Sequence, residues 1–335
     1  MEKFYRTGEE MRANYEASLE KHGDKDLHKS GVEKGVRSTA FVTAKMISSY
    51  IPGSVGMAKK FYEAAIDRIK PEEEVPDVGA PYFIELRYKS TEKIIQEMIE
   101  RFGEIQVVEI ASGFTSHGLS MTHDHSGIKK WIDNDFEASL DIKQDVANDL
   151  VAGAPMEYVP GSVLDKATWA KIKERLIPGT PVVIFCEGLM MYFTESERKV
   201  FFDEIQGLLE NNDGVFIHED LLKYQKGNKE IEEGRSSEDF ACMTKQIKEI
   251  GGNQNNEALE EFYTQEEVTQ EYEGYGFTVE RYSENELAEL SLDRYPEEVT
   301  IHTPTIKHVM HPRQNGEDLL KADFKMWVLS SNKNK

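Results

Sequence analysis

The amino-acid sequence predicts a doubly wound α/β fold, in which helices cover both faces of a mostly parallel sheet. Three observations support this prediction. From about residue 81, segments with helical periodicity alternate with short apolar segments, a pattern typical of βαβ construction. Apart from its final residue, Glu187, the run 181–187 is continuously apolar, as in strands buried on both faces, so we expect it in the middle of the sheet. The segment 106–110 leads directly into a glycine-containing turn.

The alternation can be followed along the chain. In the helix predicted at 90–102, apolar residues such as Ile94, Ile95 and Met98 share one face. Further helices are predicted at 136–150, 195–210 and 264–275. Strands are predicted at 106–110, 130–132, 156–160, 181–187, 215–219, 277–282 and 324–329.

Two regions depart from the alternation. Residues 1–80 have helical periodicity and are predicted to form an N-terminal helical lid region, separated from the main domain by a proline-bounded linker at 69–76. The main domain then covers residues 81–335, with a polar helical insertion at about 223–261. We expect both regions to cover the cleft, exclude water and set the choice of substrate.

Composition limits the partners. The chain has 335 residues, 62 acidic and 40 basic, so its formal net charge is −22. Such a charge repels phosphate backbones and anionic membranes, and we expect neither nucleic acid nor a membrane as partner. The two cysteines, Cys186 and Cys242, lack metal-type spacing, and the sequence has no apolar signal segment or membrane-spanning stretch. These features predict a cytoplasmic protein and leave its oligomeric state open.

The first candidate binding element is the turn after the strand 106–110. Glu109 lies near the end of this strand, and Ala111 and Gly113 follow it. A strand, a glycine-bearing turn and a helix together place backbone N–H groups beside a bound cofactor. A dinucleotide-binding loop has glycine where this chain has Ala111, and a carboxylate such as Glu109 suits an ammonium group better than a pyrophosphate. A turn that uses glycine only for its geometry is the alternative.

Carboxylates also follow two later strands. Asp133 and Asp135 come after the strand 130–132, about twenty residues beyond the loop, where an acid can accept both hydroxyls of a ribose. We favour Asp135 for this role because it lies just past the strand, while Asp133 supports the loop; Asp135 can also cap the helix 136–150. Glu187 ends the central strand, where open α/β sheets bind ligands, although it could merely order the loop after it.

Three segments together resemble one protein family. They are 108–114 (VEIASGF), 131–136 (WIDNDF) and 187–193 (EGLMMYF). This combination is similar to the leucine carboxyl methyltransferase-like family of S-adenosylmethionine-dependent methyltransferases, which includes bacterial O-methyltransferase relatives. The resemblance covers about residues 38–202 by motifs, and the remainder only by the order of elements. It implies a Rossmann-like class I methyltransferase sheet with S-adenosylmethionine as cofactor.

The resemblance implies roles at the methionine end of the cofactor. Arg87 would grip the methionine carboxylate with its planar guanidinium. Lys45, in a segment similar to the family's lid, would be a second partner of that carboxylate. Glu109, Gly113 and Glu187 would line the methionine side.

At the other end of the cofactor, the resemblance places Asp135 on the ribose and Ser162 and Val163 beside the adenine. Two departures from the family's pattern affect this assignment. Members often have an acidic residue before an apolar one at the adenine edge, where this chain has Ser162, so the contact must use a hydroxyl or the backbone. The first glycine of the loop is replaced by Ala111.

Catalytic residues are less defined. Methyl transfer to a carboxylate needs little acid–base help, whereas transfer to a hydroxyl needs a base, for which His117, His218 and Glu219 are candidates. Tyr192 also lies at this edge, after the central strand. Glu219 could instead cap the segment that follows it.

The segment from His123 to His125 contains two histidines and an aspartate, which could suggest a metal site. Its spacing does not match a metal site, so we predict a solvated turn and no metal.

The sequence thus predicts an S-adenosylmethionine-dependent O-methyltransferase that acts on a carboxylate or hydroxyl of a small molecule or an exposed carboxyl terminus. Two alternatives stay open. One is an NAD(P)-dependent oxidoreductase on a similar fold, against which Ala111 and Glu109 argue. The other is a non-catalytic S-adenosylmethionine-binding module, because a fold does not fix an activity.

Overall fold

A computed structural model describes residues 81–151, 153–219, 264–283, 299–302, 307–310 and 325–332. The predicted lid region 1–80, with Lys45, and the predicted insertion 223–261 lie outside these residues, as does Cys242. Within the described part of the chain, no helix has the length and apolar character needed to cross a membrane.

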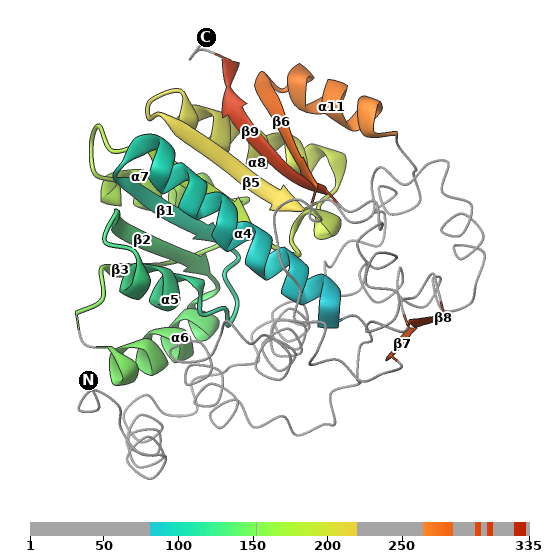
Figure 1. The fold of residues 1–335 in the computed structure, drawn as a ribbon. Helices are drawn as coiled ribbons and strands as arrows, with labels where there is room; N and C mark the ends of the chain where they lie inside the picture. Colours follow the sequence, from blue (N-terminus) through green and yellow to red (C-terminus); the bar gives the residue numbers. More distant parts are fainter. Residues whose placement is uncertain are drawn as a thin grey trace.

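The architecture is a mixed seven-stranded sheet with the order β3-β2-β1-β4-β5-β9-β6 (Figure 1). The strands from β1 to β5 are parallel, and β9 runs antiparallel to both β5 and β6. The strand bounds are β1 Ile105–Ile110, β2 Ile128–Asp135, β3 Met156–Pro160, β4 Val182–Cys186, β5 Gly214–Glu219, β6 Phe277–Ser283 and β9 Lys325–Ser331. The order reverses between β1 and β4, which is where doubly wound sheets bind ligands. A separate antiparallel pair consists of β7, Val299–His302, and β8, Lys307–Met310.

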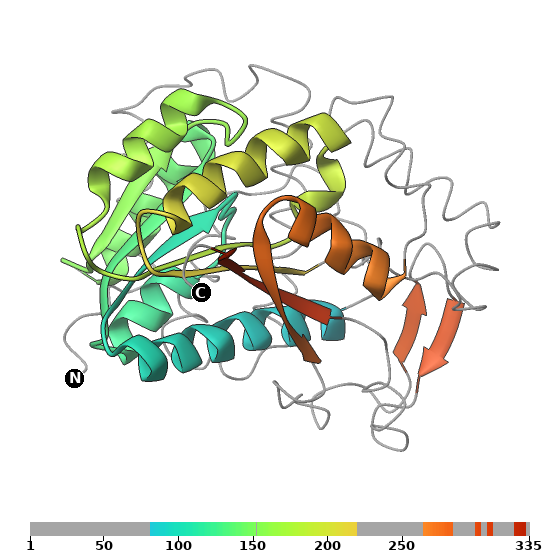
Figure 2. The ribbon, with the colours of Figure 1, turned by 90° about the horizontal axis from the view of Figure 1, so that it is seen from above.

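Helices cover both faces of this sheet (Figure 2). One face packs against α4 and α5 through Ile94, Ile95, Met98 and Met121. The other face packs against α7, α8 and α11. The helix bounds are α4 Pro81–Phe102, α5 His117–Asp124, α6 Glu137–Leu150, α7 Lys166–Arg175, α8 Glu195–Leu209 and α11 Gln265–Gly274, with a 3₁₀ turn η3 at Met190–Tyr192.

Local sequence explains where several helices begin. Both α8 and α11 start with a capping box, which is a reciprocal pair of hydrogen bonds between a threonine and the glutamate three residues later. The threonine hydroxyl accepts from the backbone N–H of the glutamate, and the glutamate side chain accepts from the backbone N–H of the threonine. The pairs are Thr194 with Glu197 and Thr264 with Glu267. Asp165 caps α7 by accepting from the N–H of Ala167. The polar residues before these helices therefore fix their first turns.

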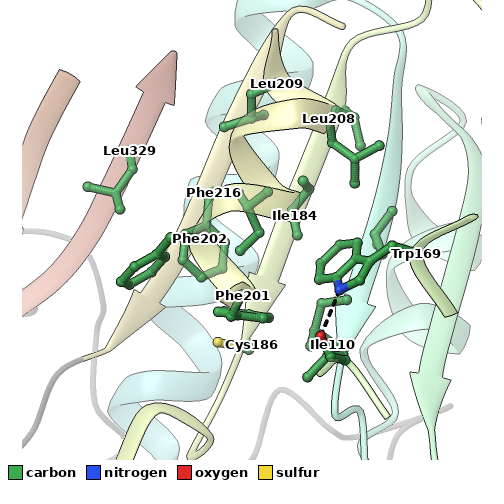
Figure 3. Packing of buried hydrophobic residues seen from close by; sticks show 14 of the residues in the cluster. Ile110, Trp169, Ile184, Cys186, Phe201, Phe202, Leu208, Leu209, Phe216 and Leu329 are labelled. Atoms are coloured by element: carbon green, nitrogen blue, oxygen red, sulfur yellow. Dashed lines mark hydrogen bonds between the residues drawn. The ribbon is translucent and has the colours of Figure 1, made fainter. Parts of the chain in front are cut away.

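The sheet separates two apolar clusters, because alternate residues of each strand point to opposite faces. The larger cluster contains Ile184, Phe216 and Leu329 from the sheet and the adjacent residues Phe201 and Phe202 from α8 (Figure 3). Phe201 is fully buried. Its ring lies 5.8 Å from that of Phe216, centroid to centroid, in an edge-to-face arrangement. These contacts hold α8 against β4 and β5.

Most of the elements predicted after residue 81 are confirmed, and the central position of β4 is confirmed as well. Two boundaries were wrong. α4 extends from Pro81 rather than Ser90, and proline fits the first turn of a helix. β2 continues through Asp135, which we had placed just past the strand, because Asp135 still pairs with Pro160 of β3.

The prediction of a solvated turn at His123 to His125 was also wrong in part. Residues His117–Asp124 form α5, although His123 and Asp124 are exposed as expected. This helix is only eight residues long and has a polar composition, so its periodicity was too weak to identify. α7 and the pair β7–β8 were missed, since each is short.

The packing of Phe201 leads to a prediction about stability. Phe201→Ala should lower the free energy of unfolding by about 3–5 kcal/mol, because it removes buried aromatic contacts and leaves a cavity. Val200 is the matched control, since it is the neighbouring residue and is 38% exposed. Val200→Ala should change the free energy of unfolding by less than about 0.5 kcal/mol. Urea denaturation of both variants measures the difference, and equal effects would contradict the packing described here.

Candidate functional site

Five carboxylates gather at the carboxyl ends of the parallel strands within the described part of the chain. They are Glu109, Asp133, Asp135, Glu187 and Glu219. Glu187 has a side chain that is 6% exposed, and the other four are 6% exposed or less as whole residues. Buried carboxylates are rare unless they are paired or hydrogen-bonded, so this concentration needs a physical account.

Strand periodicity places these carboxylates on one face. Val107, Trp131, Phe185 and Ile217 belong to the cluster that packs against α4 and α5. A residue two positions later in an extended strand lies on the same face. Each of these apolar residues is followed, after two positions, by one of the carboxylates, and Asp135 follows Asp133 at the same interval. The acids therefore point toward α4, α5 and the loop before α5.

The loop after β1 is fixed to the end of β2. Ala111 and Gly113 adopt left-handed backbone conformations, with φ values of 51° and 49°. The backbone N–H of Gly113 donates to Asp135 Oδ2 at 2.7 Å. Asp135 Oδ1 accepts from the N–H of Phe136, the residue before α6, at 2.6 Å. Because it binds no N–H inside the helix, Asp135 does not form the predicted cap. Burial raises the pKa of Asp135, against the opposing effect of these two hydrogen bonds.

A buried lysine lies between the ends of β1 and β2. Lys143 of α6 places its Nζ 3.0 Å from Asp133 Oδ2 and 3.7 Å from Glu109 Oε2. Thr115 donates its hydroxyl to Glu109, and Trp131 Nε1 donates to Asp133 Oδ1 at 2.9 Å. Burial raises the pKa of Glu109 to about 8, although Lys143 opposes the rise. Asp133 is fully buried and contacts the loop side of the site through Lys143.

An arginine has the corresponding position at the ends of β4 and β5. Arg87 of α4 donates from Nε to Glu187 Oε2 at 3.1 Å and from Nη1 to Glu219 Oε1 at 3.0 Å. Thr91, one turn further along α4, donates to Glu187 Oε1 at 2.7 Å. The N–H of Gly188 also donates to Glu219 Oε1. Helix α4 is thus joined to both strands by charged hydrogen bonds.

The two glutamates on Arg87 ionise differently. Burial disfavours the charged form of Glu187, but Arg87 and His117 outweigh burial and hold its pKa at about 2. Burial raises the pKa of Glu219 to about 7, because Arg87 compensates only part of the cost of burial. Within the described residues, Glu219 Oε2 accepts no hydrogen bond. Glu219 is therefore the less firmly held partner of the guanidinium.

His117 is enclosed between carboxylates. Its Nδ1 lies 3.3 Å from Glu92 Oε1 and its Nε2 3.3 Å from Glu187 Oε1. The ring stacks on Tyr88 with 3.8 Å between centroids. Burial disfavours the imidazolium, but Glu187, Glu92 and Glu109 together outweigh burial and raise the pKa of His117 to about 10. The ring is therefore charged at neutral pH, which argues against its predicted role as a base.

The remaining candidates are more dispersed. Ser162 is exposed in the turn after β3, where its hydroxyl accepts from the N–H of Leu164, and Val163 is buried beside it. Tyr192 ends the 3₁₀ turn after β4. His218 is fully buried and stacks on Phe216, on the face away from the carboxylates. The position of His218 does not support its predicted role as a base on the carboxylate face.

Sequence reasoning missed Lys143, Thr91 and Thr115. For Lys143 a signal existed. The buried residues of α6 recur at helical spacing, and Lys143 lies on that apolar face between Leu140 and Val146. A lysine on the buried face of a helix needs a partner of opposite charge, and the nearest strands end in acids.

Among the residues that the structure describes, no group of three or more acidic, histidine or cysteine side chains could hold a metal ion. Cys186 is a buried free thiol at the end of β4. The carboxylates of the described site have three cationic partners, Lys143, Arg87 and His117.

Comparison with known proteins gives only distant similarities. No protein-family model and no curated protein matches the chain. The chain is similar to a solved DUF574 family protein from Streptomyces avermitilis, with 13% identity and a TM-score of 0.49, over 88% of this chain and 97% of that one. It is similar to an O-methyltransferase family protein from Burkholderia thailandensis, with 9% identity and a TM-score of 0.43, over 83% of this chain and 61% of that one.

A third similarity is to the structure of PigF with SAH, with 12% identity and a TM-score of 0.40, over 93% of this chain and 73% of that one. At these identities and TM-scores, neither cofactor nor substrate can be transferred to this chain. Both have to be inferred from its own residues.

Glu219 leads to a measurable pH dependence. Its pKa is raised from 4.5 to about 7, so the folded state binds this proton more tightly than the unfolded chain does. The stabilising contribution is complete below pH 4.5 and is lost as pH rises through about 7. Glu219→Gln, which cannot ionise, should make the fall in the free energy of unfolding between these values shallower, and Glu109, whose pKa is also raised, should account for part of the fall that remains. Urea denaturation at a series of pH values measures the difference.

Glu174, an exposed glutamate on α7, provides the control. Glu174→Gln should retain the wild-type pH dependence. A Glu219→Gln variant with the same slope as wild type would show that Glu219 is ionised throughout this range.

Proposed function

We propose that this protein is an S-adenosylmethionine-dependent methyltransferase that binds its cofactor at the carboxyl edge of β1, β2 and β4. One observation carries the proposal: buried carboxylates surround the loop after β1 at the point where the strand order reverses. S-adenosylmethionine carries a sulfonium and an ammonium group, and both suit an acidic site. Its carboxylate suits the guanidinium of Arg87.

The same observation argues against a dinucleotide. A pyrophosphate needs free loop N–H groups and a site without opposing charge. Here the N–H of Gly113 donates to Asp135, and Glu109 lies buried on the adjacent strand. The charge at this edge is therefore unfavourable for NAD(P), although the fold would accommodate it.

The residues present fit S-adenosylmethionine. Two buried polar atoms, Ser112 Oγ in the loop and Glu219 Oε2, have no hydrogen-bond partner among the described residues. Asp135 uses one lone pair on each oxygen for backbone N–H groups, and a carboxylate has about four acceptor sites, so it can also accept the ribose hydroxyls. We assign Glu109, Gly113 and Glu187 to the methionine side, with Ala111 shaping the loop.

The other assignments are further from the loop. Arg87 binds the methionine carboxylate by exchanging its weaker partner, Glu219, for that group. Ser162 and Val163 flank the adenine. Lys45, a second partner of the methionine carboxylate, lies outside the described residues and stays a proposal from the sequence alone.

The acceptor is an oxygen in this proposal, in a small molecule or an exposed carboxyl terminus, as the resemblance to leucine carboxyl methyltransferase-like enzymes implies. When bound, the cofactor supplies an electrophilic methyl group. The chain's contribution is to bind, to orient and to exclude water, and positioning alone can account for much of a methyl transfer. A carboxylate acceptor needs no base. For a hydroxyl acceptor, Glu219 is the favoured base, because it lies at this edge of the sheet and its Oε2 accepts no hydrogen bond among the described residues.

Cofactor binding can be measured by titration calorimetry with S-adenosylhomocysteine. The wild type should bind it, and NAD should give no heat. Asp135→Ala should weaken binding roughly tenfold or more, because the variant loses the ribose acceptor and the anchor of Gly113. Asp124→Ala, on the exposed end of α5, should bind like the wild type. Absence of heat with the wild type would rule out the proposed cofactor.

Turnover separates an enzyme from a binding module. Formation of S-adenosylhomocysteine should be followed with panels of carboxylates, phenols and peptides that end in a free carboxyl group. A methyltransferase should show turnover with at least one oxygen acceptor. Tight binding without turnover on any panel would favour a binding module instead.

A further inference from the structure

We propose that Lys143 is a positioning residue that holds the cofactor-binding loop after β1, an inference that rests on the proposed function for its cofactor. Lys143 projects from α6, and its side chain is 1% exposed. A lysine is almost never fully buried without a specific partner. Here Nζ lies 3.0 Å from Asp133 and 3.7 Å from Glu109, the acids at the ends of β2 and β1.

The same ammonium group reaches the loop itself. It donates to Thr115 Oγ1 at 3.2 Å and lies 3.5 Å from the carbonyl oxygen of Ser112. Thr115 in turn donates to Glu109 and lies 3.0 Å from the same Ser112 carbonyl. Through these contacts, Lys143 and Glu109 connect residues 112 and 115 to the ends of β1 and β2. Asp135 separately binds the N–H of Gly113, between them in the sequence.

Charge explains why this position requires a cation. Glu109 and Asp133 are directly paired in the register of β1 and β2, and both are buried. Two acids buried side by side repel each other when both are ionised, and the ammonium group between them offsets this repulsion while it donates to the loop oxygens. The left-handed conformation of Ala111 is strained for a residue with a Cβ, so external contacts have to maintain it.

A purely structural role would be limited to neutralising the two acids. In that case the loop would keep its conformation whenever the charges are balanced in another way. The double variant Lys143→Met/Asp133→Asn tests this, because it removes one cation and one anion and leaves the net charge of the cluster unchanged. Asp133→Asn alone is the matched reference, and Lys171→Met, an exposed position on α7, is the control.

Two measurements are made on each variant. Hydrogen exchange of the amides of residues 111–116 reports the order of the loop in the ligand-free protein, and calorimetry reports the affinity for S-adenosylhomocysteine. We expect the double variant to exchange these amides roughly tenfold faster and to bind roughly tenfold more weakly than Asp133→Asn. Lys171→Met should match the wild type in both. Exchange and affinity equal to those of Asp133→Asn would overturn the positioning role.

A second variant covers failure of the double variant to fold. Thr115→Val has nearly the same shape and leaves all charges in place, but it removes the hydroxyl that Lys143 and Glu109 share. It should also accelerate exchange in residues 111–116, and unchanged exchange would overturn the proposal. Absence of binding by the wild type would defeat the proposed cofactor, whereas the exchange result would still decide whether Lys143 holds the loop.

Discussion

The pairing of buried carboxylates with buried cations is the constraint on which the rest of the site depends. Acids at the ends of β1 and β2 contact Lys143, and acids at the ends of β4 and β5 contact Arg87. An isolated ionised carboxylate in the interior is costly, so each of these strands needs a helix that delivers a cation. α6 and α4 fulfil this requirement, and their placement is thereby tied to the chemistry of the edge.

The part of the site at the ends of β1 and β2 differs in its properties from the part at the ends of β4 and β5. At β1 and β2, the cation, the carboxylates and the loop form one closely connected cluster. At β4 and β5, one guanidinium is shared by Glu187, with a pKa of about 2, and Glu219, with a pKa of about 7. The first half is suited to fixing a loop, and the second to exchanging a partner for an incoming carboxylate. Both halves meet at the reversal of the strand order.

Much of the fold could be predicted because its strands have simple patterns. The run 181–186 is apolar throughout, and most of it forms the central strand since both of its faces are covered. The acids were recognised individually from their places at strand ends. Short or polar elements such as α5 were missed, because eight residues with few apolar side chains carry little periodic signal.

The sequence by itself determined the α/β class, the central strand and the placement of Glu109 and Glu187 near strand ends, because periodicity and strand ends are local properties of the chain. Only the tertiary structure decided which groups meet. Arg87 and Glu219 are 132 positions apart, and helical spacing can indicate that Lys143 is buried but not which acids it meets. Charge pairing across such separations depends on strand order and helix placement, and no local pattern encodes either.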